Sequence, residues 1–333
     1  MTMMETGADL GASIERRRAA YPLKAIRQQY GETLAALAAE EPELLVLTAD
    51  LMHATGMAEF GARFPDRIIN VGIAEQNLTG VAAGLAAAGR PVIVDGYAAF
   101  TTLRALEQAK VDAAYNGVKL ILTGQSAGLS YGVGGPTHQT YEDVAIMRAI
   151  PNTVVLVPAD AREVDACLRA AIAYDFAGPI YVRLGRGPEY LVGDATPFEI
   201  GRGKVLRDGH HMAIIANGAM VFEAMLAAAH LADEGIGVRV LNMHTVKPLD
   251  AALLLHTAAE VGAMLVVEEH SAFGGLGGAV AEALSEVRHG PIRRIGLADA
   301  FPPIGPTFEL RDALGLSATH LVRHAHELLG GAR

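Results

Sequence analysis

The sequence predicts an α/β protein made of two consecutive domains, each built on a parallel sheet. Short apolar runs of strand length alternate with helical segments along the chain, as in sheets that helices cover on both faces. This alternation stops once, within residues 191–205, where proline and glycine replace the periodic sequence, and then starts again. A chain of 333 residues is also long enough for two hydrophobic cores.

The first domain is predicted over residues 22–190 and begins with a helix at about residues 24–39. Its expected strands are residues 44–48, 68–71, 91–95, 120–123, 154–157 and 180–183, and its other helices are residues 75–88, 101–115, 141–148 and 161–174. The glycine-rich residues 124–135 have no periodicity and are too long for an ordinary connection, which indicates a functional loop.

The second domain is predicted over residues 206–333, after a linker at residues 191–205. Its expected strands are residues 212–216, 237–242 and 263–268, and its helices are residues 220–233, 251–260 and 277–287. Residues 1–21 contain three arginines at 16–18 without an apolar run after them, so they are interpreted as a loosely ordered extension and not as a secretory signal.

The composition is that of a globular protein, with 51% hydrophobic and 19% charged residues. A formal charge of −10 argues against nucleic acid or an anionic membrane as a partner, and an anionic substrate would need local cations. The one cysteine, Cys167, lies among apolar residues of a predicted helix and is interpreted as a core thiol. A single cysteine excludes an internal disulfide and fits a reducing, cytoplasmic location.

Glu75 lies at a predicted corner between a strand and a helix. The segment at residues 67–78 reads Arg-Ile-Ile-Asn-Val-Gly-Ile-Ala-Glu-Gln-Asn-Leu, and the helix after it has an apolar stripe. A carboxyl group there loses water, which favours its neutral form and suits it to share a proton with a ring nitrogen. The alternative is an acid that only complements the helix dipole.

Several blocks in the same order give the chain a resemblance to transketolases. The sequence around Glu75 resembles the family's segment with the glutamate that contacts the aminopyrimidine of thiamine diphosphate, and Gly-Gly-Pro-Thr-His-Gln at 134–139 resembles its substrate-histidine loop. Residues 141–152 and 157–160 continue the series. The resemblance covers about residues 22–330, densely up to Arg186. It implies a thiamine-diphosphate-binding pyrimidine domain followed by a transketolase C-terminal-like domain.

The resemblance implies four contacts with the cofactor thiamine diphosphate. Glu75 matches the catalytic glutamate, and Phe100 matches the phenylalanine on which the aminopyrimidine stacks. Leu103 is expected to close the pocket, and Asp50 matches an aspartate near the cofactor at a subunit boundary. Two alternatives stay open from the residues alone, namely a core position for Phe100 and a helix cap for Asp50.

Three further residues are implied to bind the substrate. His138 would bond to a sugar hydroxyl or a developing oxyanion, and Arg186 would bind the substrate phosphate. Arg27 would supply a second guanidinium, since two such forks suit one dianion. The alternatives are an exposed loop histidine and two surface charges.

Two departures from the family's sequence affect substrate choice and architecture. Gly134 stands where members usually carry an aspartate that reads a sugar hydroxyl, and the loop at 125–132 is longer than usual and lacks an expected histidine. The sequence also contains no Gly-Asp-Gly motif. This implies that the chain is the C-terminal subunit of a split transketolase and holds no metal itself. The diphosphate and its Mg²⁺ (or Ca²⁺) would then lie on an N-terminal partner subunit, in a dimer of heterodimers.

The expected function is therefore transfer of a two-carbon ketol unit from an anionic, phosphorylated ketose to an aldose. One alternative is the β-subunit of the first component of a 2-oxoacid dehydrogenase, which shares the architecture and a similar Ile-Ala-Glu-Gln. Relatives that make deoxyxylulose phosphate are another, although they keep both halves on one chain. A non-catalytic assembly subunit is the alternative from a different class.

Overall fold

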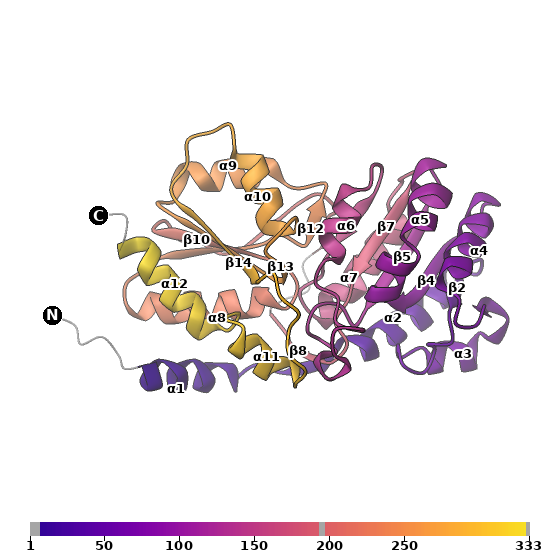
Figure 1. The fold of residues 1–333 in the computed structure, drawn as a ribbon, viewed down its shortest axis with the longest axis horizontal. Coiled ribbons are helices and arrows are strands. Elements are labelled where there is room, and N and C mark those ends of the chain that lie inside the picture. The colour runs from indigo at the N-terminus through magenta and orange to yellow at the C-terminus, as the bar shows by residue number, and fades with distance from the viewer. Residues whose placement is uncertain (1–6, 193–196, 331–333) are drawn as a thin grey trace.

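Two sheets form the centres of the molecule and lie side by side along its long axis (Figure 1). The structure is a computed structural model that describes residues 7–192 and 197–330. One sheet has seven strands and the other has five, and most neighbouring strands in both are parallel. The predicted α/β class with mostly parallel sheets is confirmed.

The seven-stranded sheet is packed between two layers of helices. In sheet order its strands are β12 (Thr245–Lys247), β6 (Val154–Leu156), β7 (Pro179–Arg183), β5 (Leu120–Gln125), β4 (Val92–Tyr97), β2 (Leu45–Thr48) and β3 (Ile68–Asn70). Alternate strand residues pack in two separate cores. The helices α2 (Ile26–Glu40) and α7 (Ala161–Ala173) complete one core, and α4 (Glu75–Ala87) and α6 (Asp143–Ala149) contribute to the other.

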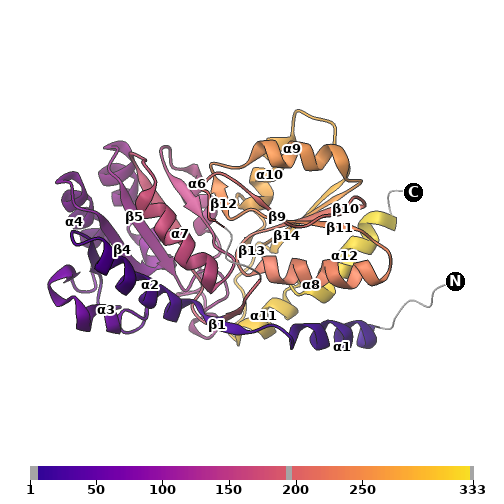
Figure 2. The same cartoon turned by 180° about the vertical axis from the view of Figure 1, so that it is seen from behind.

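The five-stranded sheet is covered in the same way (Figure 2). Its strands in order are β14 (Ile292–Leu297), β13 (Met264–Ser271), β10 (Met212–Ala216), β11 (Val238–Asn242) and β9 (Lys204–Arg207), of which β9 is antiparallel. One face packs on α8 (Met220–Asp233) and α12 (Ala318–Gly330), and α1 (Gly7–Arg18) packs on the outside of these two helices. The other packs on α9 (Ala251–Glu260) and α10 (Leu276–Leu284).

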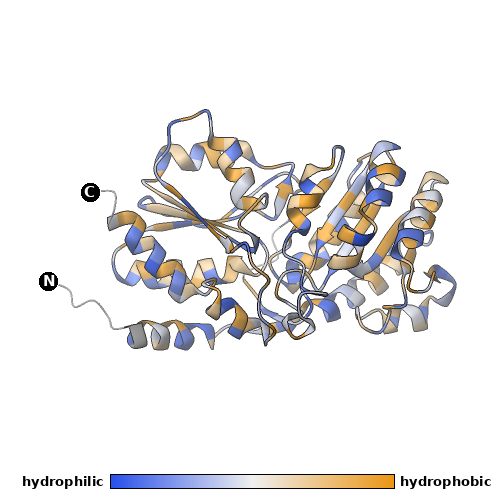
Figure 3. Ribbon diagram, in the orientation of Figure 1, coloured by the Kyte–Doolittle hydropathy of each residue, from blue (hydrophilic) through white to orange (hydrophobic). Residues whose placement is uncertain are grey.

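Colouring by hydropathy shows the same layering, because both sheets are mainly hydrophobic while the helices mix hydrophobic and hydrophilic residues (Figure 3). The smaller elements are β1 (Leu23–Ala25), β8 (Pro188–Tyr190), α3 (Ala58–Arg63), α11 (Thr307–Ala313) and the short 3₁₀-helices Pro65–Arg67 and Gly132–Gly134. Among the described residues, none of the helices is both long and apolar enough to cross a membrane.

Three sequence-based expectations need correction. The interpretation of residues 1–21 as loosely ordered is wrong for residues 7–18, which form α1 with Leu10 and Ile14 buried against the second domain. Residues 245–247 lie in the stretch assigned to the second domain, yet they form β12 at the edge of the first sheet, antiparallel to β6. The helix expected at residues 101–115 is mostly π-helical, over Ala99–Arg104 and Ala109–Tyr115 with the short α5 (Leu106–Gln108) between them.

Candidate active site

Five neighbouring strands of the larger sheet bring the predicted site residues to one edge. The strands β3, β2, β4, β5 and β7 are adjacent and parallel, so their carboxyl ends meet at the same edge. Asp50, Glu75, Phe100, Ser126 and Arg186 each follow or end one of these strands. Ligands of open α/β sheets bind at this edge.

Glu75 is the first residue of α4 and is 2% exposed, which confirms that this acid is buried at a corner between a strand and a helix. Its Oε2 accepts a hydrogen bond from Nη1 of Arg104 at 2.7 Å. The side chain of Arg104 is 50% exposed, and its guanidinium lies 4.4 Å from the ring centroid of Phe100. Sequence reasoning missed Arg104, although its position in the first turn of the helix expected at residues 101–115, close after Phe100, was a signal that the two side chains could be neighbours.

Phe100 and Leu103 line an open depression at this edge, together with Ala99, Arg104, Pro136 and Thr137. Phe100 is half-buried and Leu103 is 43% exposed, so neither belongs to the core, and the alternative of a core phenylalanine is wrong. The backbone here is π-helical, with the amide of Ala105 donating to the carbonyl of Phe100 at 3.1 Å. Single turns of π-helix occur frequently at functional sites.

Four rings pack together beside the depression. The ring of His138 meets those of Phe100, Tyr131 and Tyr97 edge-on, with centroid distances of 5.5, 5.4 and 6.1 Å. Its Nδ1 lies 2.9 Å from the hydroxyl oxygen of Thr137, whereas its Nε2 has no hydrogen-bond partner among the described residues. The aromatic neighbours fix the plane of the imidazole and leave this nitrogen available.

Arg186 lies next to the same rings. Its Nη1 donates to the phenol oxygen of Tyr97 and, at 3.5 Å, to the hydroxyl of Ser126, and its guanidinium carbon is 4.3 Å from the ring centroid of Tyr131. Arg27 is close in the backbone, since its amide donates to the carbonyl of Arg186 at 3.4 Å. The side chain of Arg27 is exposed, and the described residues offer it no ion pair.

Asp50 lies at the same edge, two residues beyond the end of β2, in a left-handed conformation with φ of 63°. Its Oδ1 accepts from the side-chain amide of Asn70 at 3.3 Å, and its own backbone amide donates to Asn70 at 3.0 Å. The carboxyl group therefore joins the ends of β2 and β3 and does not cap a helix. Among the described residues, no hydrogen bond joins Asp50 to Glu75.

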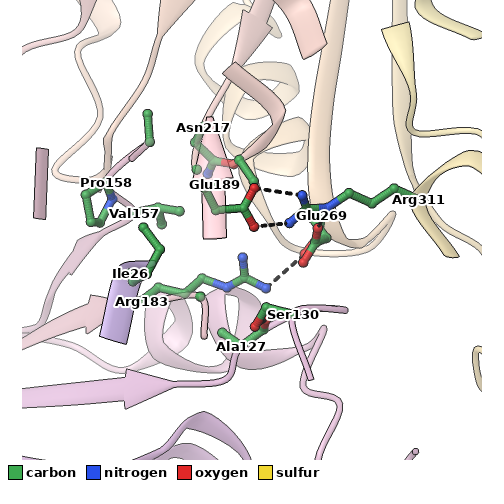
Figure 4. A pocket seen from close by; sticks show the side chains of 14 residues that line it. Ile26, Ala127, Ser130, Val157, Pro158, Arg183, Glu189, Asn217, Glu269 and Arg311 are labelled. Atoms are coloured by element: carbon green, nitrogen blue, oxygen red, sulfur yellow. Dashed lines mark hydrogen bonds and ion pairs between the residues drawn. The ribbon is translucent and has the colours of Figure 1, made fainter. Parts of the chain in front are cut away.

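Side chains of the second domain lie against the start of the substrate loop, near Ala127 and Ser130 (Figure 4). The carboxylate of Glu269, on β13, accepts from the amide of Leu129 in the loop at 2.7 Å and from the guanidinium of Arg311. Arg311 also forms two hydrogen bonds with Glu189, at 2.7 and 2.8 Å, and Nη2 of Arg183 donates to the carbonyl of Glu269 at 2.8 Å. This buried network ties β7, β8, β13 and α11 to the base of the loop.

Asp95 is a fully buried acid under the site. It accepts from the hydroxyls of Thr55 and Thr48 at 2.8 and 3.1 Å and from the side-chain amide of Gln125 at 2.9 Å. Burial raises the pKa of Asp95 to about 6, although these hydrogen bonds act in the opposite direction. Asp95 therefore joins the ends of β2, β4 and β5 at an electrostatic cost.

We expect Asp95→Asn to be tolerated better at pH 7.5 than at pH 4. A carboxyl with a raised pKa in the folded state binds more protons folded than unfolded, so its contribution to stability falls as the pH rises from about 4 to about 6. The amide avoids this cost of about 3 kcal/mol at most, but its nitrogen cannot accept the hydrogen bonds that one carboxylate oxygen accepts. We therefore expect the variant, relative to the wild type, to be about 1–2 kcal/mol more stable at pH 7.5 than at pH 4.

Denaturant unfolding followed by circular dichroism at both pH values measures this difference in a chain that has no tryptophan. Asp66→Asn, at an exposed position, is the matched control and should change stability by less than about 0.5 kcal/mol. An equal effect of Asp95→Asn at pH 4 and pH 7.5 would contradict the assigned cost.

Two mostly parallel-sheet domains, with a buried acid, a half-buried aromatic ring and an arginine at one carboxyl edge, are typical of an α/β enzyme subunit that binds its ligand at this edge. The chain belongs to the transketolase family: its residues 24–188 match the transketolase pyrimidine-binding domain and residues 201–321 match the transketolase C-terminal domain. Thiamine diphosphate is the cofactor of this family.

Among curated relatives, the 6-deoxy-6-sulfo-D-fructose transketolase subunit SqwH of Clostridium sp. is 40% identical, over 91% of this chain and 94% of that protein. A subunit of the apulose-4-phosphate transketolase of Phocaeicola vulgatus is 36% identical, over 92% and 97%. A solved split-gene transketolase, an inactive β4 tetramer, has 39% identity and a TM-score of 0.84, over 93% of this chain and 99% of its own. The chain is thus a split-transketolase subunit, as predicted.

Proposed function

We propose that this chain forms the aminopyrimidine-facing half of an active site that it shares with an N-terminal transketolase subunit. The complete enzyme would move a two-carbon ketol unit from an anionic ketose to an aldose. The observation that carries this proposal is the arrangement of Glu75 and Phe100, which together hold one planar nitrogen group, the guanidinium of Arg104.

This arrangement supports a fit to the aminopyrimidine. The ring needs an aromatic face on one side and a carboxyl group toward a ring nitrogen, and Arg104 uses the same two surfaces with its own flat, nitrogen-bearing group. Arg104 is half exposed, so its side chain has room to move aside. Phe100, Leu103 and Glu75 would hold the ring, and Asp50 would approach it from the end of β2.

Thiamine diphosphate, when bound, supplies the carbon that takes up and releases the two-carbon unit. Glu75 would hold the proton that its carboxyl group shares with the aminopyrimidine, in a place from which water is excluded. His138 would donate from Nε2 to a sugar oxygen, because its aromatic neighbours orient that nitrogen. Arg186 would bind the terminal anion of the sugar, with Arg27 as a second cation beside it.

The partner subunit would hold the diphosphate and its Mg²⁺ or Ca²⁺, since this sequence has no Gly-Asp-Gly motif. A dimer of heterodimers is the proposed assembly, and the inactive β4 tetramer of the related split transketolase supports the need for a second kind of chain. The substrates named for two relatives, a sulfonated and a phosphorylated sugar, support an anionic substrate here. The single cysteine, a buried free thiol, supports a cytoplasmic location.

The alternatives differ in what they need from the site. A 2-oxoacid dehydrogenase subunit would have no need for His138 and Arg186 beside the cofactor pocket, and a non-catalytic subunit would have no need for the paired Glu75 and Phe100. Both alternatives predict that the reconstituted complex has no ketol-transfer activity.

We expect the chain alone to bind thiamine diphosphate and Mg²⁺ at least about a hundredfold more weakly than the complex with an N-terminal subunit, a difference of about 2.7 kcal/mol in binding free energy. The reason is that one chain offers only the pyrimidine half of the site. Isothermal titration calorimetry of the chain, of the partner and of the mixture measures this difference. Tight binding by the chain alone would contradict a shared site.

A further inference from the structure

Tyr131 is the residue of the substrate loop that the proposed function leaves without a role. It lies just before the short 3₁₀-helix Gly132–Gly134, is half-buried, and packs its ring against Tyr97 and His138 with centroid distances of 5.9 and 5.4 Å. The described residues give its hydroxyl no hydrogen-bond partner. A tyrosine whose ring is fixed and whose phenol is free is suited to bind a ligand.

The ring of Tyr131 fills the space beside Gly134. A Cβ atom added to Gly134 would lie 3.0 and 3.1 Å from Cδ1 and Cε1 of Tyr131 and 2.9 Å from Cβ of His138. These separations are shorter than ordinary carbon contacts, so a side chain at position 134 requires Cβ of His138 and the ring of Tyr131 to shift by a few tenths of an ångström. The glycine therefore allows this position of Tyr131, and an aspartate at 134 would push the ring away from it.

The same ring also orients Arg186. The guanidinium carbon of Arg186 lies 4.3 Å from the centroid of Tyr131, close enough for cation–π attraction. The Nη1 atom of Arg186 is occupied by Tyr97 and Ser126, whereas its Nε and Nη2 have no partner within the described part of the chain. The edge formed by these two nitrogens is the one that pairs with two oxygens of an anion.

We infer that Tyr131 is a specificity-determining residue that, with Arg186, forms the subsite for the terminal anion of the substrate. The inference rests on the proposed function. In place of the aspartate that would read a sugar hydroxyl at position 134, the loop presents a neutral ring and a phenol that can donate a hydrogen bond. The ligand class is a ketose with a terminal tetrahedral oxyanion, and phosphate and sulfonate share this chemistry.

The test uses the reconstituted complex with three donors of one carbon skeleton: D-fructose 6-phosphate, 6-deoxy-6-sulfo-D-fructose and D-fructose. For Tyr131→Ala we expect kcat/KM to fall about tenfold for whichever anionic donor the wild type uses, mainly through KM, and less than about twofold for D-fructose. In the wild type, the ratio of kcat/KM for the phosphorylated donor to kcat/KM for the sulfonated donor shows which anion the subsite prefers. Arg186→Ala is the reference for loss of the anion subsite.

Three further variants separate the parts of the inference. Tyr131→Phe keeps the ring over Arg186, so for the anionic donors it should lose only the part of kcat/KM that the phenol hydroxyl contributes. Gly134→Asp should shift the ring of Tyr131 and lower kcat/KM for the anionic donors, and adding Tyr131→Ala to it should cause no further loss with these donors. Tyr174→Ala is the matched control, because Tyr174 stacks on Phe176 after the end of α7, at the opposite edge of the sheet. It should leave kcat/KM unchanged for all three donors.

Calorimetric titration of each complex with thiamine diphosphate shows whether the variants keep the cofactor site, and we expect unchanged affinity for Tyr131→Ala. An equal loss of kcat/KM for the anionic donors and for D-fructose would overturn the role of Tyr131 while leaving the proposed function intact. A wild-type complex that neither binds nor turns over any of the donors would overturn the proposed function and, with it, this inference.

Discussion

Glu75→Gln is expected to lower kcat of the reconstituted complex about 10³-fold, since a positioned acid or base contributes roughly 10²–10⁴. Glutamine fills the same buried space at the start of α4 and its oxygen can still accept from Arg104. Its amide, however, neither carries a negative charge nor gives up and takes back a proton. Steady-state ketol transfer at saturating cofactor measures the loss.

The folding and assembly of this variant should be normal, because the substitution preserves volume and the partner of Glu75 is a half-exposed arginine. Size-exclusion chromatography of the complex checks this expectation. Glu43→Gln is the matched control: its side chain is 70% exposed, before the start of β2 at the far edge of the sheet, and it should keep full activity. Wild-type turnover by the Glu75 variant would remove this acid from the mechanism.

The regular elements of both domains were predictable, because each buries an apolar face with a clear period. The strands that cross the sheet centres are short apolar runs, and α4, α7, α8 and α9 begin and end within two residues of the expected limits. The buried position of Glu75 followed from the same pattern. Helix α12 was also within reach of the sequence, since Leu321, Val322, Ala325 and Leu328 show helical spacing.

Other elements depend on tertiary contacts that a local pattern does not contain. Helix α1 has only Leu10 and Ile14 as large buried apolar residues, and its order comes from packing on α8 and from the ion pair of Arg18 with Glu223. Strand β12 is three residues long and exists because β6 offers a free edge. The π-helical turns of residues 99–115 have the same composition as an ordinary helix.

Site residues that belong to a sequence motif were predictable. Site residues that matter because side chains from separate strands and loops meet in the fold were not. Glu75, Phe100, His138 and Arg186 came from motifs, and the structure brings the last three to one group of rings. Tyr131 was passed over because its significance lies in its distance to Gly134 and Arg186, which only the folded loop defines. Their roles in catalysis and binding stay predictions until the variants are measured.

The second large effect is expected in stability. Arg311→Met should destabilise the chain by about 3–5 kcal/mol at pH 7.5, the usual cost of removing one partner of a buried ion pair. Arg311 is 3% exposed and lies between Glu189 and Glu269, which are also buried. Burial raises the pKa of Glu189 even with Arg311 in place, and without the arginine its charge would have no compensation.

The pH dependence of this loss separates lost charge compensation from lost packing. An acid whose pKa is raised takes up a proton as the pH falls, so the Arg311→Met penalty should shrink between pH 7.5 and pH 5. Replacing both acids as well, by Glu189→Gln and Glu269→Gln, should recover much of the stability at pH 7.5, because no uncompensated charge remains. Thermal and denaturant unfolding measure both the single and the triple variant.

Arg63→Met provides the matched control, since Arg63 pairs with Glu59 on the surface and both side chains are about half exposed. We expect a change below about 0.5 kcal/mol there. A loss for Arg311→Met that is independent of pH and unrelieved by the two glutamines would show that Arg311 acts through packing alone. The same network bonds to Leu129, so the charge-based explanation also requires a weaker hold on the substrate loop, visible as a higher KM for the anionic donor at temperatures where the variant stays folded.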